Sequence, residues 1–257
     1  MIDSHVHLDD NRFKKDQERV IKNFEADGVD LVVNIGADLV TSKSSVFLAE
    51  NNERIYATVG VHPHDAKTYD QEVEDQLRML SKREKVVAIG EIGLDYHYDN
   101  SPRDVQQDVF RKQLKLAQEV NLPVVIHSRE ADKDTMDILK EAKEDNPKLV
   151  CLIHCFSSSV EIMREYVKMG FSISLGGATT FKNAKTPKQV AVEVPIEHLL
   201  LETDAPYMTP EPYRGKRNEP KYVRLVAENI AELRGMDVEE VIRITDENTK
   251  KFYGISL

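Results

Sequence analysis

The apolar positions of this chain fall into short β-branched runs, and segments with helical periodicity separate them. The runs predict eight buried strands, at residues 2–7, 30–35, 55–61, 86–92, 123–127, 149–154, 171–175 and 198–204. The segments between and after them predict amphipathic helices, at about 11–27, 38–51, 70–84, 101–120, 130–145, 158–169, 184–193, 219–234 and 237–252. A strand followed by a crossover helix is typical of parallel sheets.

This alternation predicts the α/β class and, within it, a (β/α)8 TIM barrel. Strands that are apolar throughout indicate burial on both faces, and regular right-handed crossovers close naturally into a barrel. An open, doubly wound sheet is the alternative. No Pro-, Gly- or Ser-rich linker divides the chain, so we predict a single domain over 1–257. The sequence has neither a GxGxxG nor a Walker motif, which excludes the usual dinucleotide and P-loop sites.

Composition narrows the class of protein further. With 257 residues, 40% of them hydrophobic, the chain can bury a full core and is neither disordered nor fibrous. No apolar run approaches the roughly 18 residues of a membrane span, and the N-terminus lacks a signal-peptide pattern, so we expect a cytoplasmic protein with no membrane association. The net charge of −10 argues against a protein coated in nucleic acid but permits a local basic site. Nothing in the sequence predicts an oligomeric state.

Unusual polar residues stand at the carboxyl ends of five predicted strands: His5 and His7, Glu91, His127, His154, and Asp204. In a barrel these ends share the rim that holds the active site. Burying several titratable groups without partners is costly, and divalent metal removes that cost. Six ligands exceed the needs of one tetrahedral ion, so we predict two divalent ions with Glu91 as the bridge.

Other residues are expected to surround this centre. His62 and His64, in GVHPHD after the third strand, could bind a metal or a substrate phosphate, and His62 could instead orient a ligand. Strand parity places Glu202 beneath Asp204, where it is predicted to hydrogen-bond a ligating histidine. His97 and His198 are interpreted as structural.

The alternation of side chains along a strand places the two cysteines on the side opposite the predicted metals. Cys151 and Cys155 flank His154, which suggests a zinc thiolate, but both point away if His154 points inward. They are therefore interpreted as small hydrophobic residues that suit a reducing compartment.

One basic segment differs from the solvated charges on the helices. After the last strand, Arg214, Lys216 and Arg217 lie in a Pro- and Gly-rich loop that leads into a helix N-terminus. Guanidinium groups and helix N-termini both favour phosphate, and Arg129 adds a donor close to His127. A substrate phosphate site is therefore predicted at Arg129, Arg214 and Arg217.

These residues together resemble the TatD family of metal-dependent deoxyribonucleases, among the amidohydrolase-like barrels. The matching stretches, in order, are DSHVHLD, GVHPHDA, GEIGLDYH, HSREA, HCFS, LLLETDAPYMTP and RGKRNEP. The resemblance implies metal-dependent hydrolysis of DNA, with exonuclease action at single-stranded or frayed 3′ ends. It also implies that the six rim residues are metal ligands and that His62 and Arg129 lie on the substrate side.

The predicted reaction is phosphodiester hydrolysis by two metal ions, with Asp204 accepting the proton of the attacking water and Glu91 bridging the ions. Imidazole ligands favour Zn²⁺, Mn²⁺, Co²⁺ or Ni²⁺, whereas the family resemblance implies Mg²⁺ or Mn²⁺ in assays. The alternatives are a carboxyl-ester or amide hydrolase on the same barrel, such as a lactonase, a phosphotriesterase-like enzyme or a D-aminoacyl-tRNA deacylase, and a non-catalytic scaffold that binds metal or nucleic acid.

Overall fold

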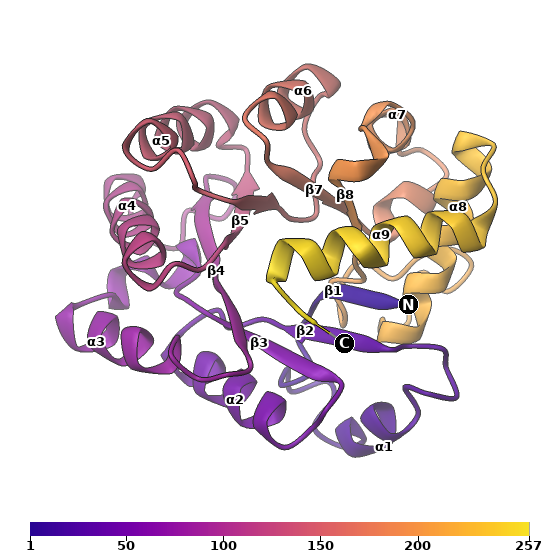
Figure 1. Ribbon diagram of the computed structural model, residues 1–257, viewed down its shortest axis with the longest axis horizontal. Helices are drawn as coiled ribbons and strands as arrows, with labels where there is room; N and C mark the ends of the chain where they lie inside the picture. Colours follow the sequence, from indigo (N-terminus) through magenta and orange to yellow (C-terminus); the bar gives the residue numbers. More distant parts are fainter. Residues whose placement is uncertain (257) are drawn as a thin grey trace. The chain divides into compact units, whose positions relative to one another are not determined.

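The computed structural model describes residues 1–256, and its chain divides into two compact units. Unit 1 comprises residues 1–34 and the chain from Cys155 onward, and unit 2 comprises residues 35–154. Strands and helices alternate along the chain in both units. The reader can trace this alternation in Figure 1, where the colours run with the sequence from indigo to yellow.

Unit 1 is built on four parallel strands: β1 (Ile2–Val6), β2 (Leu31–Asn34), β7 (Ser172–Leu175) and β8 (Leu199–Leu201). β1 pairs with β2, and β7 pairs with β8. A parallel bridge between Val6 and Ala205 joins β1 to the segment that follows β8. The helices of this unit are α1 (Gln17–Lys22), α6 (Val160–Lys168), α7 (Lys185–Glu193), α8 (Val223–Arg234) and α9 (Val238–Tyr253). The first and last strands of the chain are therefore neighbours.

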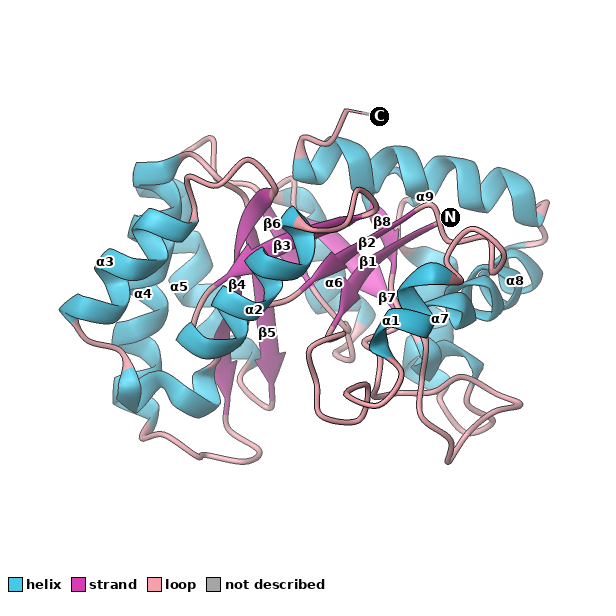
Figure 2. Ribbon diagram, turned by 90° about the horizontal axis from the view of Figure 1, so that it is seen from below, coloured by secondary structure: helices cyan, strands magenta, loops and turns pink. Residues whose placement is uncertain are grey.

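Unit 2 carries the other four strands: β3 (Ile55–Val59), β4 (Val86–Asp95), β5 (Val124–Arg129) and β6 (Cys151–Ile153). They pair in that order, all parallel. Its helices are α2 (Leu39–Glu50), α3 (Gln71–Leu80), α4 (Arg103–Val120) and α5 (Asp132–Asp145). Figures 1 and 2 show α3, α4 and α5 side by side along β4 and β5. The strands are thereby shielded from solvent by the apolar faces of these helices.

The predicted (β/α)8 class is confirmed. Eight parallel strands alternate with helices, and β1 lies beside β8 instead of at the edge of an open sheet. Most of their side chains are apolar and buried, with Val32, Ile89 and Leu200 among those at 0% exposure. Among residues 1–256, none of the helices combines the length and the apolar character needed to cross a lipid bilayer.

Several predicted boundaries were wrong, for local reasons. β4 extends to Asp95, beyond the predicted end at 92, because Gly93 lets it stay paired with β5. β8 ends at Leu201, so Glu202 and Asp204 lie in the following loop. α1 begins only at Gln17, because the preceding residues form turns and Asp16 makes no side-chain cap.

Several other helices begin at a residue whose side chain caps the helix N-terminus. Asp38 accepts a hydrogen bond from the Thr41 backbone N–H at 2.7 Å, and Thr41 Oγ1 accepts from the Asp38 N–H, which completes a capping box. Asp70, Ser159 and Asp237 cap α3, α6 and α9 in the same sense. These caps satisfy backbone donors that a helix cannot satisfy internally.

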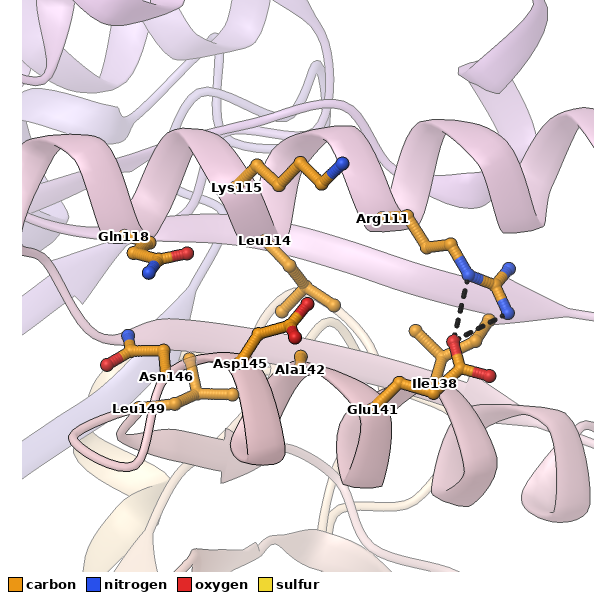
Figure 3. Close-up of a pocket in the computed structure, with 10 residues that line it drawn as sticks. All are labelled: Arg111, Leu114, Lys115, Gln118, Ile138, Glu141, Ala142, Asp145, Asn146 and Leu149. Carbon is orange, nitrogen blue, oxygen red and sulfur yellow. Dashed lines mark hydrogen bonds and ion pairs between the residues drawn. The ribbon is translucent and has the colours of Figure 1, made fainter.

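A surface groove lies between α4 and α5, on the helical side of unit 2 (Figure 3). Leu114 and Ile138 are among its lining residues, and Arg111 donates to Glu141 at 3.1 Å across it. No predicted ligand lines this groove. Its walls come from the helices instead of the carboxyl ends of the strands, so the groove is separate from the predicted chemistry.

Gly93 allows β4 and β5 to approach closely beside the predicted ligands. Its φ is +140°, a region that residues with a side chain rarely adopt, and a Cβ added there would meet the His127 carbonyl oxygen at 2.0 Å. Only glycine therefore fits, and the pairing of Gly93 with His127 brings β4 against the strand that carries a ligand.

We expect Gly93→Ala to reduce the free energy of unfolding by about 2–5 kcal/mol, through backbone strain and overpacking together. Urea unfolding monitored by circular dichroism measures this loss. Gly170→Ala is the matched control: φ is +78° there but no atom lies within 4 Å of the added Cβ, so only about 1–2 kcal/mol should be lost. Equal losses in the two variants would contradict the close-approach argument.

Candidate metal centre

In unit 1, His5, His7 and Asp204 converge after β1 and β8. The His5 and His7 Nε2 atoms lie 3.3 Å apart, and the Asp204 Oδ1 atom lies 3.5 Å from His7 Nε2 and 3.8 Å from His5 Nε2. The backbone fixes this arrangement, because the Asp204 N–H donates to the His5 carbonyl at 3.0 Å. Asp204 itself has a positive φ of +54°, which turns the chain at the end of the strand. Two nitrogens and one oxygen at these separations form a set that can hold a cation.

The buried carboxyl group of Asp3 connects the backbone segments that carry this cluster. Asp3 has no solvent exposure, and it accepts hydrogen bonds from the Thr203 backbone N–H at 2.9 Å and from the His5 N–H at 3.3 Å. Its second oxygen lies 2.5 Å from Thr203 Oγ1. Burial raises the pKa of Asp3 to about 8, although these hydrogen bonds act in the opposite direction. Asp3 thus joins β1 to the chain segment that carries Asp204.

In unit 2, three imidazoles converge on a single oxygen of Glu91. The Glu91 Oε1 atom lies 2.8 Å from His154 Nε2, 2.9 Å from His127 Nδ1 and 3.5 Å from His62 Nε2. Glu91 is only 4% exposed. Burial alone would raise its pKa, but the imidazoles hold the pKa well below the ordinary value. Glu91 is therefore an ionised acceptor at a point where three nitrogens also meet.

A backbone contact sets the protonation of His62. The His64 N–H donates to His62 Nδ1 at 3.2 Å, so the neutral His62 ring carries its proton on Nε2, the nitrogen that faces Glu91. Burial lowers the pKa of His62 to about 4, and the charge of His127 acts in the same direction. His62 is therefore a neutral donor that faces Glu91, and with Glu91 and His127 it forms a group that could hold a metal ion. Its predicted place on the substrate side stays a prediction.

Asp95, which the sequence analysis missed, lies in the same cluster. Its Oδ2 atom is 3.0 Å from His127 Nε2 and 3.0 Å from His64 Nε2. Burial alone would raise the pKa of Asp95, but the His127 contact and the backbone donors lower it overall. A signal was available in the sequence: Asp95 has the same strand parity as Glu91. The predicted strand stopped at 92, so this parity was not followed.

Both ligand sets fit divalent metal ions. Each unit supplies imidazole nitrogens and a carboxylate oxygen within a few ångströms of one another, the donor types that Zn²⁺, Mn²⁺, Co²⁺ and Ni²⁺ accept. The structure thus brings His5, His7 and Asp204 together in one unit, and Glu91, His127 and His154 in the other.

A comparison with protein-family models decides the class of protein. The model described as "TatD related DNase" matches residues 2–254. This chain belongs to the TatD family. The family consists of metal-dependent hydrolases by the names of its curated members, which agrees with the two ligand sets.

Relatives of this TatD-family protein match it along its whole length. An uncharacterized metal-dependent hydrolase, YabD of Bacillus subtilis, is 48% identical over 256 residues, which cover 100% of both chains. YcfH of Escherichia coli, which has the same description, is 38% identical and covers 99% of this chain and 96% of its own. The crystal structure of YjjV, a TatD homologue from Escherichia coli, superposes with a TM-score of 0.93 at 31% identity, covering 100% of this chain and 98% of that one.

The loop that carries Arg214 and Arg217 in this TatD-family protein was predicted to bind phosphate. One of its two arginines is bound to carboxylates, and the other is exposed. Arg217 donates to both carboxylate oxygens of Asp16, at 2.6 and 2.8 Å, and to Glu219 at 2.8 Å, and its guanidinium lies 4.4 Å from the Phe13 ring centroid. This network argues against Arg217 as a phosphate ligand. Arg214 is exposed and rests 3.6 Å from the centroid of the Phe181 ring. It keeps its donors toward solvent.

The remaining substrate-side residues of unit 2 are Arg129, the last residue of β5, and His64, in the short 3-10 helix Pro63–Thr68. Arg129 is exposed, and its guanidinium lies 4.9 Å from the Tyr98 ring centroid. His64 is partly buried because Asp95 binds its Nε2 atom. His97 pairs with Glu130 at 2.7 Å. Arg129 is therefore the exposed cation at the end of β5.

Glu202 and the two cysteines are predicted from the sequence to lie outside the ligand set. Glu202 is fully buried and accepts a hydrogen bond from Ser174 Oγ at 2.5 Å, while its predicted bond to a ligating histidine stays a prediction. Burial raises the pKa of the Cys151 thiol well above its ordinary value. Neither cysteine belongs to a group within residues 1–256 that could hold a metal. A thiol that stays protonated is a poor ligand.

The raised pKa of Asp3 predicts a specific pH dependence of stability. The folded protein keeps a proton on Asp3 up to about pH 8, whereas the unfolded chain releases it near 3.8, so the contribution of Asp3 to stability falls as pH rises between these values. In metal-free protein, Asp3→Asn should therefore gain stability relative to the parent by up to about 1.4 kcal/mol per pH unit from pH 5 to 8. Urea unfolding at each pH measures the difference. A difference that stays constant with pH would show that Asp3 is ionised throughout.

Proposed function

We propose that this protein is a divalent-metal-dependent deoxyribonuclease that acts at 3′ ends of DNA, single-stranded or frayed. The observation that carries the proposal is the ligand set at the strand ends of each unit: two histidines with Asp204 in unit 1, and two histidines with Glu91 in unit 2. The family description "TatD related DNase" supports phosphodiester chemistry over other ester hydrolysis.

Each ligand set has the donors for one divalent ion, held by His5, His7 and Asp204 in unit 1 and by Glu91, His127 and His154 in unit 2. The bridging role that the sequence assigns to Glu91 stays a prediction. When bound, the ions would acidify a water molecule and offset the charge on the phosphate. We expect a transition metal in purified protein and activity with Mg²⁺ or Mn²⁺.

Asp204 accepts the proton in the proposed reaction. The water oxygen attacks phosphorus, the bond from phosphorus to the 3′ oxygen breaks, and the proton held by Asp204 passes to the leaving oxygen. The side chain of Asp204 is 16% exposed beside His7, so water can reach a carboxylate that a ligand histidine already contacts. Glu91 is more deeply buried and holds imidazoles, which makes it the less suitable base.

In the proposed reaction, exposed arginines hold the DNA backbone. The exposed guanidinium groups of Arg129 and Arg214 can each donate to phosphate oxygens, whereas the Nε2–H of His62 faces Glu91, so the substrate role of His62 stays a prediction. These contacts act locally, which a net charge of −10 permits.

The decisive variant is Glu91→Gln, which keeps the shape of the side chain but removes the charge on which three imidazoles converge. We expect metal content to fall and hydrolysis of 3′-labelled single-stranded DNA with Mn²⁺ to drop by at least about 100-fold. Metal analysis by mass spectrometry and gel electrophoresis of the digest measure the two effects. Chelation with EDTA should abolish the activity of the parent protein.

Glu130→Gln is the matched control, because Glu130 is an exposed carboxylate of the same unit that pairs with His97 and not with a candidate ligand. It should leave metal content and digestion unchanged. Parent protein that cleaves an acyl ester or D-aminoacyl-tRNA but not DNA would replace the nuclease with the acyl-hydrolase alternative. Full activity and full metal content in Glu91→Gln would refute the ligand assignment.

The two loop arginines should behave differently toward salt. Arg214→Gln should weaken oligonucleotide binding and flatten the slope of log affinity against log salt by about 0.7, the value for one lost contact to single-stranded DNA. Arg217→Gln should leave the slope nearly unchanged and lower the free energy of unfolding by about 1 kcal/mol, since Asp16 and Glu219 lose their partner. Fluorescence anisotropy at several salt concentrations separates the two. The reverse pattern would restore Arg217 as the phosphate ligand.

A further inference from the structure

The carboxylate of Asp95 has its two oxygens committed to different partners. Oδ1 accepts the backbone N–H groups of His97, at 3.0 Å, and Tyr98, at 2.8 Å. Oδ2 lies 3.0 Å from the Nε2 atoms of both His127 and His64. Asp95 has no solvent exposure. One oxygen therefore fixes the carboxylate to the backbone, while the other meets two imidazoles.

The surroundings prevent this carboxylate from turning. Gln106 of α4 accepts the Asp95 backbone N–H at 2.8 Å and donates to the Asp95 carbonyl at 3.1 Å. A second bond from the same amide to the Ser101 carbonyl, at 2.8 Å, holds Gln106 itself. The main chain of Asp95 is thus clamped on the helix side, and its side chain is clamped by the turn that follows.

We propose that Asp95 is a positioning residue that keeps a proton on Nε2 of both His127 and His64, so that His127 turns Nδ1 toward Glu91. A carboxylate accepts hydrogen bonds and donates none, so each nitrogen at 3.0 Å from Oδ2 must carry the hydrogen. Nδ1 is then the nitrogen of His127 that lies 2.9 Å from Glu91 Oε1.

The consequence for His127 is preorganisation of a ligand. In the metal-free protein Glu91 accepts the hydrogen of Nδ1 at 2.9 Å, so Nδ1 must lose that hydrogen before it can offer a lone pair to a metal. The Nε2–H bond to Asp95 leaves Nδ1 as the nitrogen that can do so and sets the ring orientation in advance. The metal part of this inference rests on the proposed function, through the ligand role of His127. The tautomer part rests on the geometry of Asp95 alone.

The consequence for His64 narrows its predicted substrate role. With Nε2–H bound by Asp95, a neutral His64 has only the lone pair of Nδ1 to offer, and it cannot donate to a phosphate oxygen. Arg129 is then the phosphate donor that the proposed function retains in this unit. His64 instead shares with His127 the carboxylate that orients both rings.

Asp95→Asn tests the proposal, because its amide has one oxygen and one donor group. The N–H groups of His97 and Tyr98 retain the oxygen, so the new amide hydrogens point at the two Nε2 atoms. Both rings should then lose the hydrogen on Nε2, which nitrogen-15 NMR of the metal-free protein observes directly. Calorimetric titration with Mn²⁺ should show affinity reduced by about 10- to 100-fold.

Asp134→Asn is the matched control, because Asp134 accepts from Tyr96 Oη at 2.7 Å and from Gln107 at 2.9 Å, and neither donor is an imidazole. It should change neither the tautomers nor the Mn²⁺ affinity. Asp95→Glu, which restores an acceptor, should recover the hydrogen on at least one Nε2 atom.

The outcomes separate this inference from the proposed function. An Nε2 atom without hydrogen on His127 or His64 in the parent protein would overturn the inference, and this readout needs no variant that folds. Unchanged tautomers in a folded Asp95→Asn protein would overturn it as well. A tautomer change without loss of Mn²⁺ affinity would refute the ligand-positioning part. A parent protein with the expected tautomers that does not cleave DNA would refute the proposed function alone.

Discussion

The convergence of three imidazoles on one buried carboxylate oxygen is the constraint around which unit 2 is arranged. Glu91 Oε1 meets His154, His127 and His62 within 3.5 Å, in surroundings where water screens little. Every proton in such a cluster needs a defined place, because an unsatisfied buried donor or charge is costly. The His64 backbone defines the proton on His62, and Asp95 defines the one on His127. The Nε2–H of His62 and the Nδ1 atom of His127 thereby face Glu91.

Buried amide side chains hold the backbone beside the candidate ligands in both units. Gln113 accepts the Val61 N–H at 2.8 Å and donates to the Val61 carbonyl at 2.9 Å, immediately before His62, and Gln106 clamps Asp95 in the same way. In unit 1, Asn34 accepts the Leu8 N–H at 2.6 Å, just after His7. Asn218 donates to the carbonyls of Thr203 and Tyr207, on either side of Asp204. An amide can both donate and accept, so it satisfies loop backbone that no strand can pair. The backbone on either side of the candidate ligands is therefore held by hydrogen bonds from these amides.

The two arginines of one loop, Arg214 and Arg217, have different surroundings. Arg217 stacks on Phe13 and bonds to two carboxylates, which makes it part of the packing that connects the loop to the start of α1. Arg214, in the same motif, keeps its guanidinium exposed over Phe181. The identity of the side chain is the same, but the number of acidic neighbours within reach decides whether it stabilises the fold or remains available to a ligand.

The sequence by itself determined the order of strands and helices, the barrel class and the choice of ligand candidates, because apolar periodicity and strand-end position are local properties of the chain. His5, His7 and Asp204, and likewise Glu91, His127 and His154, could be selected from their places at the ends of apolar runs. Tertiary structure alone decided the rest. Asp95 belongs to the cluster because Gly93 keeps β4 paired with β5. Arg217 is not available as a phosphate ligand because its guanidinium is bound to Asp16. Tautomers were also beyond the sequence, since the position of a proton on His62 or His127 depends on which backbone group or carboxylate lies within about 3 Å of each nitrogen.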